Sequence, residues 1–473
     1  MAALRLSSKR CLSSRLHLSS RLAVRAASTS TSNLPADAKA EFAKEVRLPA
    51  HDPAADSQSA ALVGQYLPFM VATYARPGQV FVKGDGCYLY DIENRRYIDF
   101  NAGIAVNALG HGDPQLTNLI YDQAKQLIHV SNLYHNPWTG ALSRLLVERT
   151  KELGGFKDAS KAFICNSGSE ANEAAIKFAR KVGKVVGGDK KVGIVSFYNS
   201  FHGRTMGSLS ATPNPKYQKP FAPMVPGFSY GKYNDVDGID ALVTEETCGV
   251  IVEPIQGEGG IWVGSDEFLT KLRKRCTEVG AVLIYDEIQC GIGRTGKLWA
   301  HEHLPKEAHP DIVTMAKALG NGFPVGATMV NEFVAEKIMV GDHGTTYGGN
   351  PLASRVGHYV FDRIAKPEFL AAVEGKSKIF VKHLQALKEK YPELITEIRG
   401  KGLILGAQLD RDPSDIVKEC RERGLLVITA GTNVLRFVPP LVIEENTIEE
   451  GMKILDDALA AVCLGRVITS RGS

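Results

Sequence analysis

The sequence predicts an α/β protein with a mostly parallel sheet in a large domain and a smaller α/β domain at the C-terminal end. From about residue 115, short continuous apolar runs alternate with helical patterns, which is typical of buried parallel strands. After about residue 365 a long amphipathic helix is followed by further strand-like stretches. Apolar residues make up 44% and charged residues 23% of the 473 residues, which excludes disorder over most of the chain.

The N-terminal segment 1–36 differs from the rest of the chain in its charge. It holds six of the 56 basic residues and no acidic residue, which leaves 50 basic and 52 acidic residues elsewhere. An amphipathic segment rich in Arg and Ser, without a continuous apolar stretch, is typical of a mitochondrial transit peptide. A disordered basic tail is the alternative. We expect a protein of the mitochondrial matrix.

The composition also bears on partners. The net charge of +4 gives no general attraction to nucleic acid. No apolar run reaches the ~18 residues of a transmembrane helix. Eight cysteines without CxxC pairs favour neither a disulfide framework nor a zinc ribbon. We therefore expect no nucleic-acid partner, no membrane partner and no metal.

The predicted elements fall into four segments. Segment 1–36 is the transit peptide, 37–110 is an N-terminal segment with a β-hairpin, 111–360 is the large domain, and 361–473 is the small domain. The hairpin is expected at 88–91 and 96–100, and the strands of the large domain at the apolar runs 162–165, 192–197, 250–252, 281–285 and 312–315. The small domain is expected to contain a long helix with Leu370, Val373, Phe380, Leu384 and Leu387 on one face, strands at 402–409 and 434–438, and a final helix that Thr447 and Glu450 begin as a capping box.

Polar residues follow each of the five apolar runs of the large domain. Because the carboxyl ends of parallel strands share one edge of a sheet, where α/β proteins bind ligands, we expect these residues to converge. They lie in the segments 166–170, 201–204, 253–258, 286–289 and 316–317.

Two of these segments predict a phosphate site and a reactive amine. Gly168 and Ser169 begin a predicted helix, whose free N–H groups favour a phosphate, although plain N-capping is the alternative. Asp286 ends one apolar run and, because it is buried, needs a partner, for which an ordinary salt bridge is the alternative. Lys317 follows the run 312–315 and is expected to be partly desolvated, which lowers the pKa of its amine and makes it a nucleophile. Together they fit pyridoxal phosphate, which needs a lysine, an acid beside its ring nitrogen and a helix N-terminus.

The glycine run Gly291–Gly296 matches the GxGxxG pattern of dinucleotide-binding proteins. The residues that follow it have no helical apolar period, and Asp311 precedes a strand instead of ending one. We therefore do not expect a dinucleotide site. His301 and His303 lack the HExxH spacing of zinc enzymes and are expected at the surface.

Seven ordered motifs between about Tyr66 and Leu459 resemble those of the class III (ω-amino acid) pyridoxal phosphate aminotransferases of fold type I. They are Asn166–Asn172, Phe201–Arg204, Glu253–Glu258, Asp286–Gln289 with the glycine run, Ala316–Gly322, Thr345–Pro351 and Leu435–Pro440. Within the class, Asp99–His111 and Ser131–His135 are most similar to the mitochondrial, fungal members that act on N2-acetyl-L-ornithine.

The resemblance implies a set of residue roles around the cofactor. Lys317 is expected to bind pyridoxal 5′-phosphate covalently and to transfer the proton, and Asp286 to hold a proton on the ring nitrogen. Gln289 is expected at the ring hydroxyl, Phe201 on the ring face, and Gly168 and Ser169 at the phosphate, with Thr346 from the neighbouring subunit of a homodimer.

The resemblance also implies the substrates. The δ-amino group of N2-acetyl-L-ornithine is expected to pass to 2-oxoglutarate, which gives N-acetyl-L-glutamate 5-semialdehyde and L-glutamate in arginine biosynthesis. Arg204 and Thr345 are expected at the acetylornithine carboxylate. Arg436 is expected at a carboxylate of 2-oxoglutarate and to pair with Glu258 when the amino donor is bound. Ornithine or 4-aminobutyrate as amino donor, an aminomutase, and a catalytically silent cofactor-binding protein are the alternatives.

Overall fold

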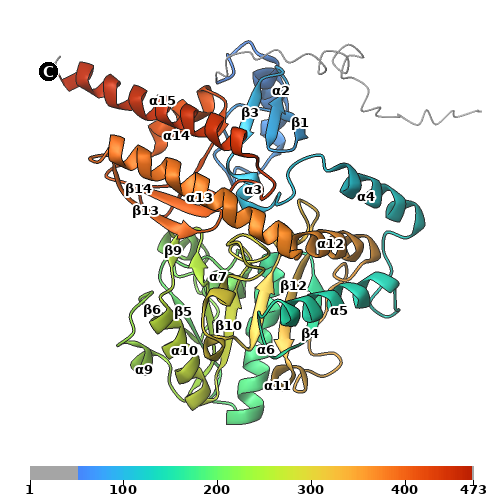
Figure 1. The fold of residues 1–473 in the computed structure, drawn as a ribbon. Helices are drawn as coiled ribbons and strands as arrows, with labels where there is room; N and C mark the ends of the chain where they lie inside the picture. The colour runs from blue at the N-terminus through green and yellow to red at the C-terminus, as the bar shows by residue number, and fades with distance from the viewer. Residues whose placement is uncertain (1–51, 471–473) are drawn as a thin grey trace, which may run out of the picture. The chain divides into compact units, whose positions relative to one another are not determined.

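The computed structural model describes residues 52–470, so the predicted transit segment lies outside the described residues (Figure 1). A seven-stranded sheet in the order β4-β12-β11-β10-β7-β5-β6 carries the site. Its strands are β4 (Ala159–Cys165), β5 (Gly193–Phe197), β6 (Phe228–Gly231), β7 (Thr247–Val252), β10 (Val282–Asp286), β11 (Ile312–Met315) and β12 (Gly326–Asn331).

The sheet is mostly parallel, as predicted. Strand β10 is parallel to both β11 and β7, and β5 is parallel to both β7 and β6. Strand β12 alone runs antiparallel, to both β11 and β4, so β4 points the same way as β11. The carboxyl ends of all five predicted strands therefore lie at one edge. Strands β6 and β12 were not predicted, because neither contains a continuous apolar run.

Helices cover both faces of this sheet, which explains the continuous apolar runs. Val282 and Ile284 of β10 pack with the buried face of α6 (Gly168–Gly187). Leu283 and Tyr285 of the same strand pack with α10 (Asp266–Val279) on the other face. Beside the sheet, α5 (Pro137–Glu152) packs against both β4 and α12 (Pro351–Ile364).

The predicted hairpin is confirmed. It lies in a sheet of β1 (Phe81–Asp85), β2 (Tyr88–Asp91), β3 (Arg96–Asp99) and β15 (Leu425–Leu426), in which β2 and β3 are antiparallel. The two-residue strand β15 is parallel to β3, so the N-terminal segment is joined to the C-terminal part of the chain.

A third sheet forms the C-terminal part, in the order β13-β14-β17-β16. Its strands are β13 (Ile395–Lys401), β14 (Ile404–Leu409), β17 (Val434–Phe437) and β16 (Ile428–Ala430), with the helices α13 (Pro367–Lys390), α14 (Ser414–Glu422) and α15 (Glu445–Ser470). All five apolar residues predicted to share a face of α13 are buried. The predicted capping box is wrong, because Ile448 N already donates to Glu444 O and places Thr447 inside α15.

The remaining elements are short or peripheral. They are the helices α2 (Gln58–Tyr66), α3 (Ala102–Ala105), α4 (Pro114–Gln126), α7 (Met206–Ser210), α8 (Pro215–Gln218), α9 (Ile239–Leu242) and α11 (Glu332–Ala335), and the strands β8 (Ile255–Gln256) and β9 (Trp262–Val263). Within residues 52–470, no helix combines the length and apolar character needed to cross a membrane.

Candidate active site

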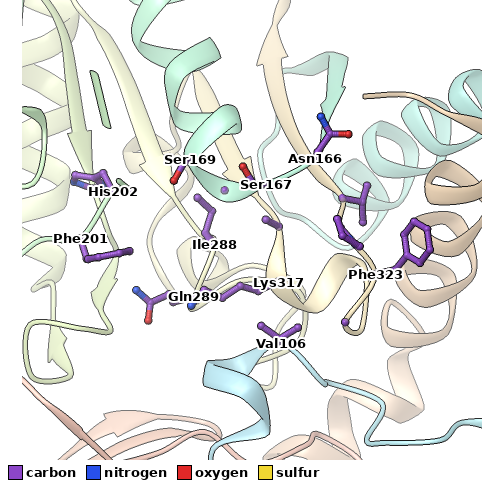
Figure 2. Close-up of a pocket in the computed structure, with 16 residues that line it drawn as sticks. Val106, Asn166, Ser167, Ser169, Phe201, His202, Ile288, Gln289, Lys317 and Phe323 are labelled. Atoms are coloured by element: carbon purple, nitrogen blue, oxygen red, sulfur yellow. The ribbon is translucent and has the colours of Figure 1, made fainter. Parts of the chain in front are cut away.

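A cavity of about 280 Å³ opens at the carboxyl edge of the large sheet (Figure 2). This volume is close to the lower end of the ~300–1,000 Å³ typical of small-molecule sites. Residues that follow β4, β5, β10 and β11 form its walls, and Val106 and residues 322–325 complete it. The lining residues are Val106, Asn166, Ser167, Gly168, Ser169, Phe201, His202, Gly203, Ile288, Gln289, Ala316, Lys317, Gly322, Phe323, Pro324 and Val325.

The N-terminus of α6 forms one wall. Ser167 caps the helix, because its Oγ accepts from Glu170 N at 3.2 Å. Gly168 and Ser169 are the first two helical residues, whose N–H groups have no acceptor inside the helix and favour an anion. Gly203 lies against this turn with φ of +134°, and a Cβ there would stand 2.4 Å from Ser169 Oγ. Both features form a narrow cradle for a small anionic group.

Asp286 ends β10 and is only 3% exposed. Its Oδ2 accepts from Asn172 Nδ2 and lies next to His202 Nδ1, both at 2.7 Å, and its Oδ1 accepts from Ile288 N at 3.1 Å. Asn172 is fixed in turn, because its Oδ1 accepts from Thr314 Oγ1 at 2.8 Å. These contacts hold the buried carboxylate in one orientation.

Lys317 lies two residues after the end of β11, whose Thr314 is the register partner of Asp286 on β10. Its Nζ donates to Ile104 O at 3.1 Å. Burial, and to a lesser extent the charge of the nearby Arg436 guanidinium, lower the pKa of Lys317 to about 8. The amine is therefore neutral in a much larger fraction at neutral pH than that of an ordinary lysine.

Strained backbone surrounds this amine. Lys317 has φ of +37°, and Ala102 to Ala105, including Ile104 at +66°, all have positive φ. Such a run of left-handed residues costs roughly 1–2 kcal/mol for each non-glycine residue. Strain of this kind persists where the surrounding structure holds it, and it clusters at functional sites.

Glu253 joins the backbone of Phe201, which lines the cavity, to the loop after β8. Its Oε1 accepts from Phe201 N at 2.9 Å and its Oε2 from Gly257 N at 3.1 Å. Burial raises the pKa of Glu253 well above its ordinary value, and the charge of Asp286 raises it further. The Phe201 ring thus stands on a fixed backbone. The guanidinium carbon of Arg204 lies 5.4 Å from that ring and 3.6 Å from the ring of Tyr217.

A buried arginine lies beside Gln289. Arg436 of β17 is 2% exposed, and its Nη1 donates to Gln289 Oε1 at 3.2 Å. Its Nη2 forms an ion pair with Glu258 Oε2 at 2.9 Å. Glu258 is 36% exposed at its side chain, so the acid can leave the pair toward solvent while the arginine cannot. The arrangement offers a buried cation to a carboxylate that displaces Glu258.

The structure brings most of the predicted site residues together. Gly168, Ser169, Phe201, Gln289 and Lys317 line the cavity. The others contact a lining residue directly or through one further residue. Asp286 contacts the lining residue His202, Thr345 contacts Asn166, and Arg204 contacts Ser169. Arg436 contacts Gln289, and Glu258 contacts Arg436. Thr346 is exposed and does not line the cavity.

Sequence reasoning missed two residues that support Asp286, namely Asn172 and His202. Both lie inside the motifs that were singled out, but nothing in the local sequence shows that their side chains meet Asp286. His301 was wrongly expected at the surface. It is fully buried beside Glu287, which accepts from the backbone of Ala300 and His301 and anchors the loop after β10.

The chain after the glycine run does not form the helix that dinucleotide-binding proteins have at this place. After Gly296 the chain forms turns and the short helix Ala300–His303, so the dinucleotide-binding pattern lacks its helix. In residues 52–470 no group of three His, Cys, Asp or Glu side chains is arranged to hold a metal ion.

Comparison with known families decides the class. The sequence profile of the family "Aminotransferase class-III" matches residues 71–459. The chain belongs to the class-III aminotransferases. The Neurospora crassa protein named "Acetylornithine aminotransferase, mitochondrial" is 62% identical over 90% of this chain and 92% of its own length. The Saccharomyces cerevisiae protein of the same name is 52% identical over 83% and 94%. These names confirm the predicted mitochondrial location.

Solved structures of the family share the fold. The N-acetylornithine aminotransferase of Stenotrophomonas maltophilia has a TM-score of 0.72 and 35% identity, over 85% of this chain and 100% of that one. The ornithine aminotransferase of Toxoplasma gondii has a TM-score of 0.79 and 30% identity, over 87% and 96%, and that crystal holds pyridoxal phosphate (PLP) at partial occupancy in the active site. The chain is thus a transaminase with the fold type I architecture.

Proposed function

We propose that the chain transfers the δ-amino group of N2-acetyl-L-ornithine to 2-oxoglutarate with pyridoxal 5′-phosphate as cofactor, and so gives N-acetyl-L-glutamate 5-semialdehyde and L-glutamate for arginine biosynthesis. One observation carries the chemistry: beside an anion cradle, a buried carboxylate ends β10 and an amine with a lowered pKa lies two residues after the adjacent strand β11. The names of the similar fungal proteins support the substrate.

The residues present fit this cofactor. The cradle of Gly168, Ser169 and Gly203 suits a phosphate, because it offers helix N-terminal donors and has no room for a further side chain. Phe201 stands on one wall for stacking on an aromatic ring, and Gln289 offers an amide to a ring hydroxyl. Lys317 would bind the cofactor covalently, and Asp286 would lie at the ring nitrogen. Bound there, the cofactor supplies an electron sink for the carbon that loses its proton.

The side chains of the chain supply the proton transfers. The Lys317 amine, with a pKa of about 8, accepts and returns a proton near neutral pH. Asp286 would hold a proton on the ring nitrogen of the bound cofactor, and Asn172 and His202 keep its carboxylate oriented. Ile104 O accepts from Lys317 Nζ and holds the amine within the cavity.

Arginines explain how one site accepts two acids. Arg204 would bind the carboxylate of N2-acetyl-L-ornithine, with Thr345 beside it, and Arg436 would bind a carboxylate of 2-oxoglutarate. Glu258 would neutralise Arg436 while the amino donor is bound and move aside for the keto acid. The observed Glu258–Arg436 ion pair is the state expected for the amino donor.

Ornithine remains a second candidate, because the Toxoplasma gondii ornithine aminotransferase has the higher TM-score of the two structures, 0.79 against 0.72. The fold therefore does not separate the two substrates, whereas the 62% identity to the Neurospora crassa protein favours the acetylated donor. 4-Aminobutyrate is a third candidate donor, since class motifs do not fix the substrate.

We propose a homodimer in which Thr346 of one subunit contacts the cofactor phosphate of the other. Thr346 and its neighbour Tyr347 are exposed. Asn132 Nδ2 donates to Thr345 O at 3.1 Å, so the two residues after Asn132, the exposed apolar Leu133 and Tyr134, lie in the same region. For the organisation of the chain we propose the boundaries 1–36, 37–110, 111–360 and 361–473.

A substrate panel tests the proposal. Turnover of N2-acetyl-L-ornithine, ornithine and 4-aminobutyrate is measured with 2-oxoglutarate as acceptor and, in parallel, without any keto acid. We expect the acetylated donor to be the fastest, and only with the keto acid present. Faster turnover of free ornithine would reject the substrate, and turnover without keto acid would indicate an aminomutase.

A further inference from the structure

Glu258 lies at the tip of a small hairpin. Strand β8 pairs antiparallel with β9, with Gln256 opposite Trp262, so residues 257–261 form the tip. The tip is packed tightly from two sides: a Cβ on Gly259 would stand 2.0 Å from Asn199 O, and a Cβ on Gly431 would stand 2.3 Å from Gly259 O. The backbone of Glu258 therefore has little room to move.

Arg399 of β13 holds this tip from the C-terminal sheet. Its Nε donates to Gly260 O at 2.7 Å, and its guanidinium carbon lies 3.7 Å from the centre of the Trp262 ring. Its side chain is only 8% exposed, although it also pairs with the half-exposed Glu397. A planar cation that both stacks and donates in this way fixes its partners in one geometry.

Gln408 closes a ring of contacts between Arg399 and Glu258. Its Oε1 accepts from Arg399 Nη2 at 2.9 Å, and its Nε2 donates to Thr432 O at 3.0 Å. The neighbouring Gly431 N donates to Glu258 O at 2.7 Å. Gln408 lies on β14, which pairs with β17, the strand of Arg436. The ring thus joins the backbone of Glu258 to the sheet that carries its ion-pair partner.

We propose that Arg399 is a positioning residue that selects between the two substrates by holding Glu258 opposite Arg436. The inference rests on the proposed function, in which Glu258 covers Arg436 for the amino donor and uncovers it for the keto acid. Because the ring fixes the backbone of Glu258 while its side chain is 36% exposed, the pair opens by rotation of that side chain, with the hairpin unmoved.

The consequence is an effect on one half of the reaction. Without Arg399 the tip loses its contacts with β13 at Gly260 and Trp262. Glu258 then spends less time at 2.9 Å from Arg436. The amino donor then meets Arg436 without its Glu258 partner, so kcat/KM for the amino-donor half-reaction should fall roughly tenfold. This is about the effect expected from the loss of one hydrogen bond and one cation–π contact. The keto-acid half-reaction needs Arg436 uncovered and should stay within about twofold, since its binding group is unchanged.

The experiment follows the two half-reactions of the holoenzyme separately by cofactor absorbance. The variants are Arg399→Ala, Arg399→Lys and the matched control Glu397→Gln, which removes only the outer ion pair of Arg399. Each is also made in a Glu258→Ala background. The donor is whichever amine the unmodified enzyme turns over fastest, so rejection of N2-acetyl-L-ornithine as substrate would leave this test intact.

We expect Arg399→Ala to slow only the amino-donor half, Arg399→Lys to restore part of the rate, and Glu397→Gln to change neither half. In the Glu258→Ala background, Arg399→Ala should change kcat/KM of the amino-donor half-reaction less than about twofold, because Arg399 acts through Glu258 and that side chain is absent. Equal losses in both halves, or the same tenfold loss without Glu258, would overturn the proposal. If Arg399→Ala does not fold, Gln408→Met opens the same ring and decides by the same criteria.

Discussion

Replacement of Asn172 by alanine would test how Asp286 is held. The Asn172 amide donates to Asp286 Oδ2 and to His202 O, both at 2.7 Å, and accepts from Thr314 Oγ1 at 2.8 Å. The bond to the carboxylate contributes ~1.5–3 kcal/mol and the other two ~0.5–1.5 kcal/mol each. Since all these groups are buried, we expect Asn172→Ala to lower the free energy of unfolding by ~3–5 kcal/mol.

The control for this variant is Thr314→Val, which removes one hydroxyl on the far side of the amide. It should cost only ~1 kcal/mol, because Asn172 keeps both of its donor bonds. Urea unfolding measures both losses, and titration with cofactor measures affinity, which should weaken about tenfold in Asn172→Ala alone. Equal losses of stability and unchanged cofactor affinity in both variants would refute the view that Asn172 orients Asp286.

Three further predictions concern the active site. Because the pKa of Lys317 is about 8, the neutral fraction of its amine grows steeply as the pH rises toward 8. The rate at which cofactor-free protein reacts with pyridoxal phosphate should rise about tenfold per pH unit below pH 8 and level off above it; a rise that continues to about pH 10 would indicate an ordinary lysine. Gly203→Ala should weaken cofactor binding by ~1–3 kcal/mol, because an alanine would be strained at a φ of +134° and its Cβ would press on Ser169. The control Gly375→Ala, where a Cβ meets nothing within 4 Å, should leave binding unchanged. Arg436→Lys should raise the KM for 2-oxoglutarate at least about tenfold, since lysine cannot bind a carboxylate bidentately; an unchanged KM would place the keto acid elsewhere.

The large sheet could be predicted wherever a strand is buried on both faces. Residues 247–252 and 282–286 are buried throughout, and the apolar runs 250–252 and 282–285 within them are continuous. The polar residues at the end of each run are therefore easy to recognise in the sequence. Strand β12 is equally buried but contains Gly326, Thr328 and Asn331. Thr328 is tolerated there because its hydroxyl donates to Ala171 O at 2.8 Å, a tertiary contact that no local pattern reveals.

The site was predictable in its residue types but not in its pairings. Gly168, Asp286 and Lys317 could be found because strand ends and helix starts are visible in the sequence. The bond from Asn172 to Asp286 spans 114 positions along the chain, so its existence depends on the order of the strands in the sheet. The pairing of Glu258 with Arg436 came from the family resemblance, and their ion pair is present at 2.9 Å.

Chemical trapping tests the central claim most directly, namely that Lys317 is the amine that binds the cofactor opposite Asp286. The purified holoenzyme is reduced with borohydride, digested, and its cofactor-modified peptide is sequenced. We expect a single modified lysine at 317, and none after Lys317→Arg. A modified lysine at another position, or a protein that stays colourless with added pyridoxal phosphate, would contradict it.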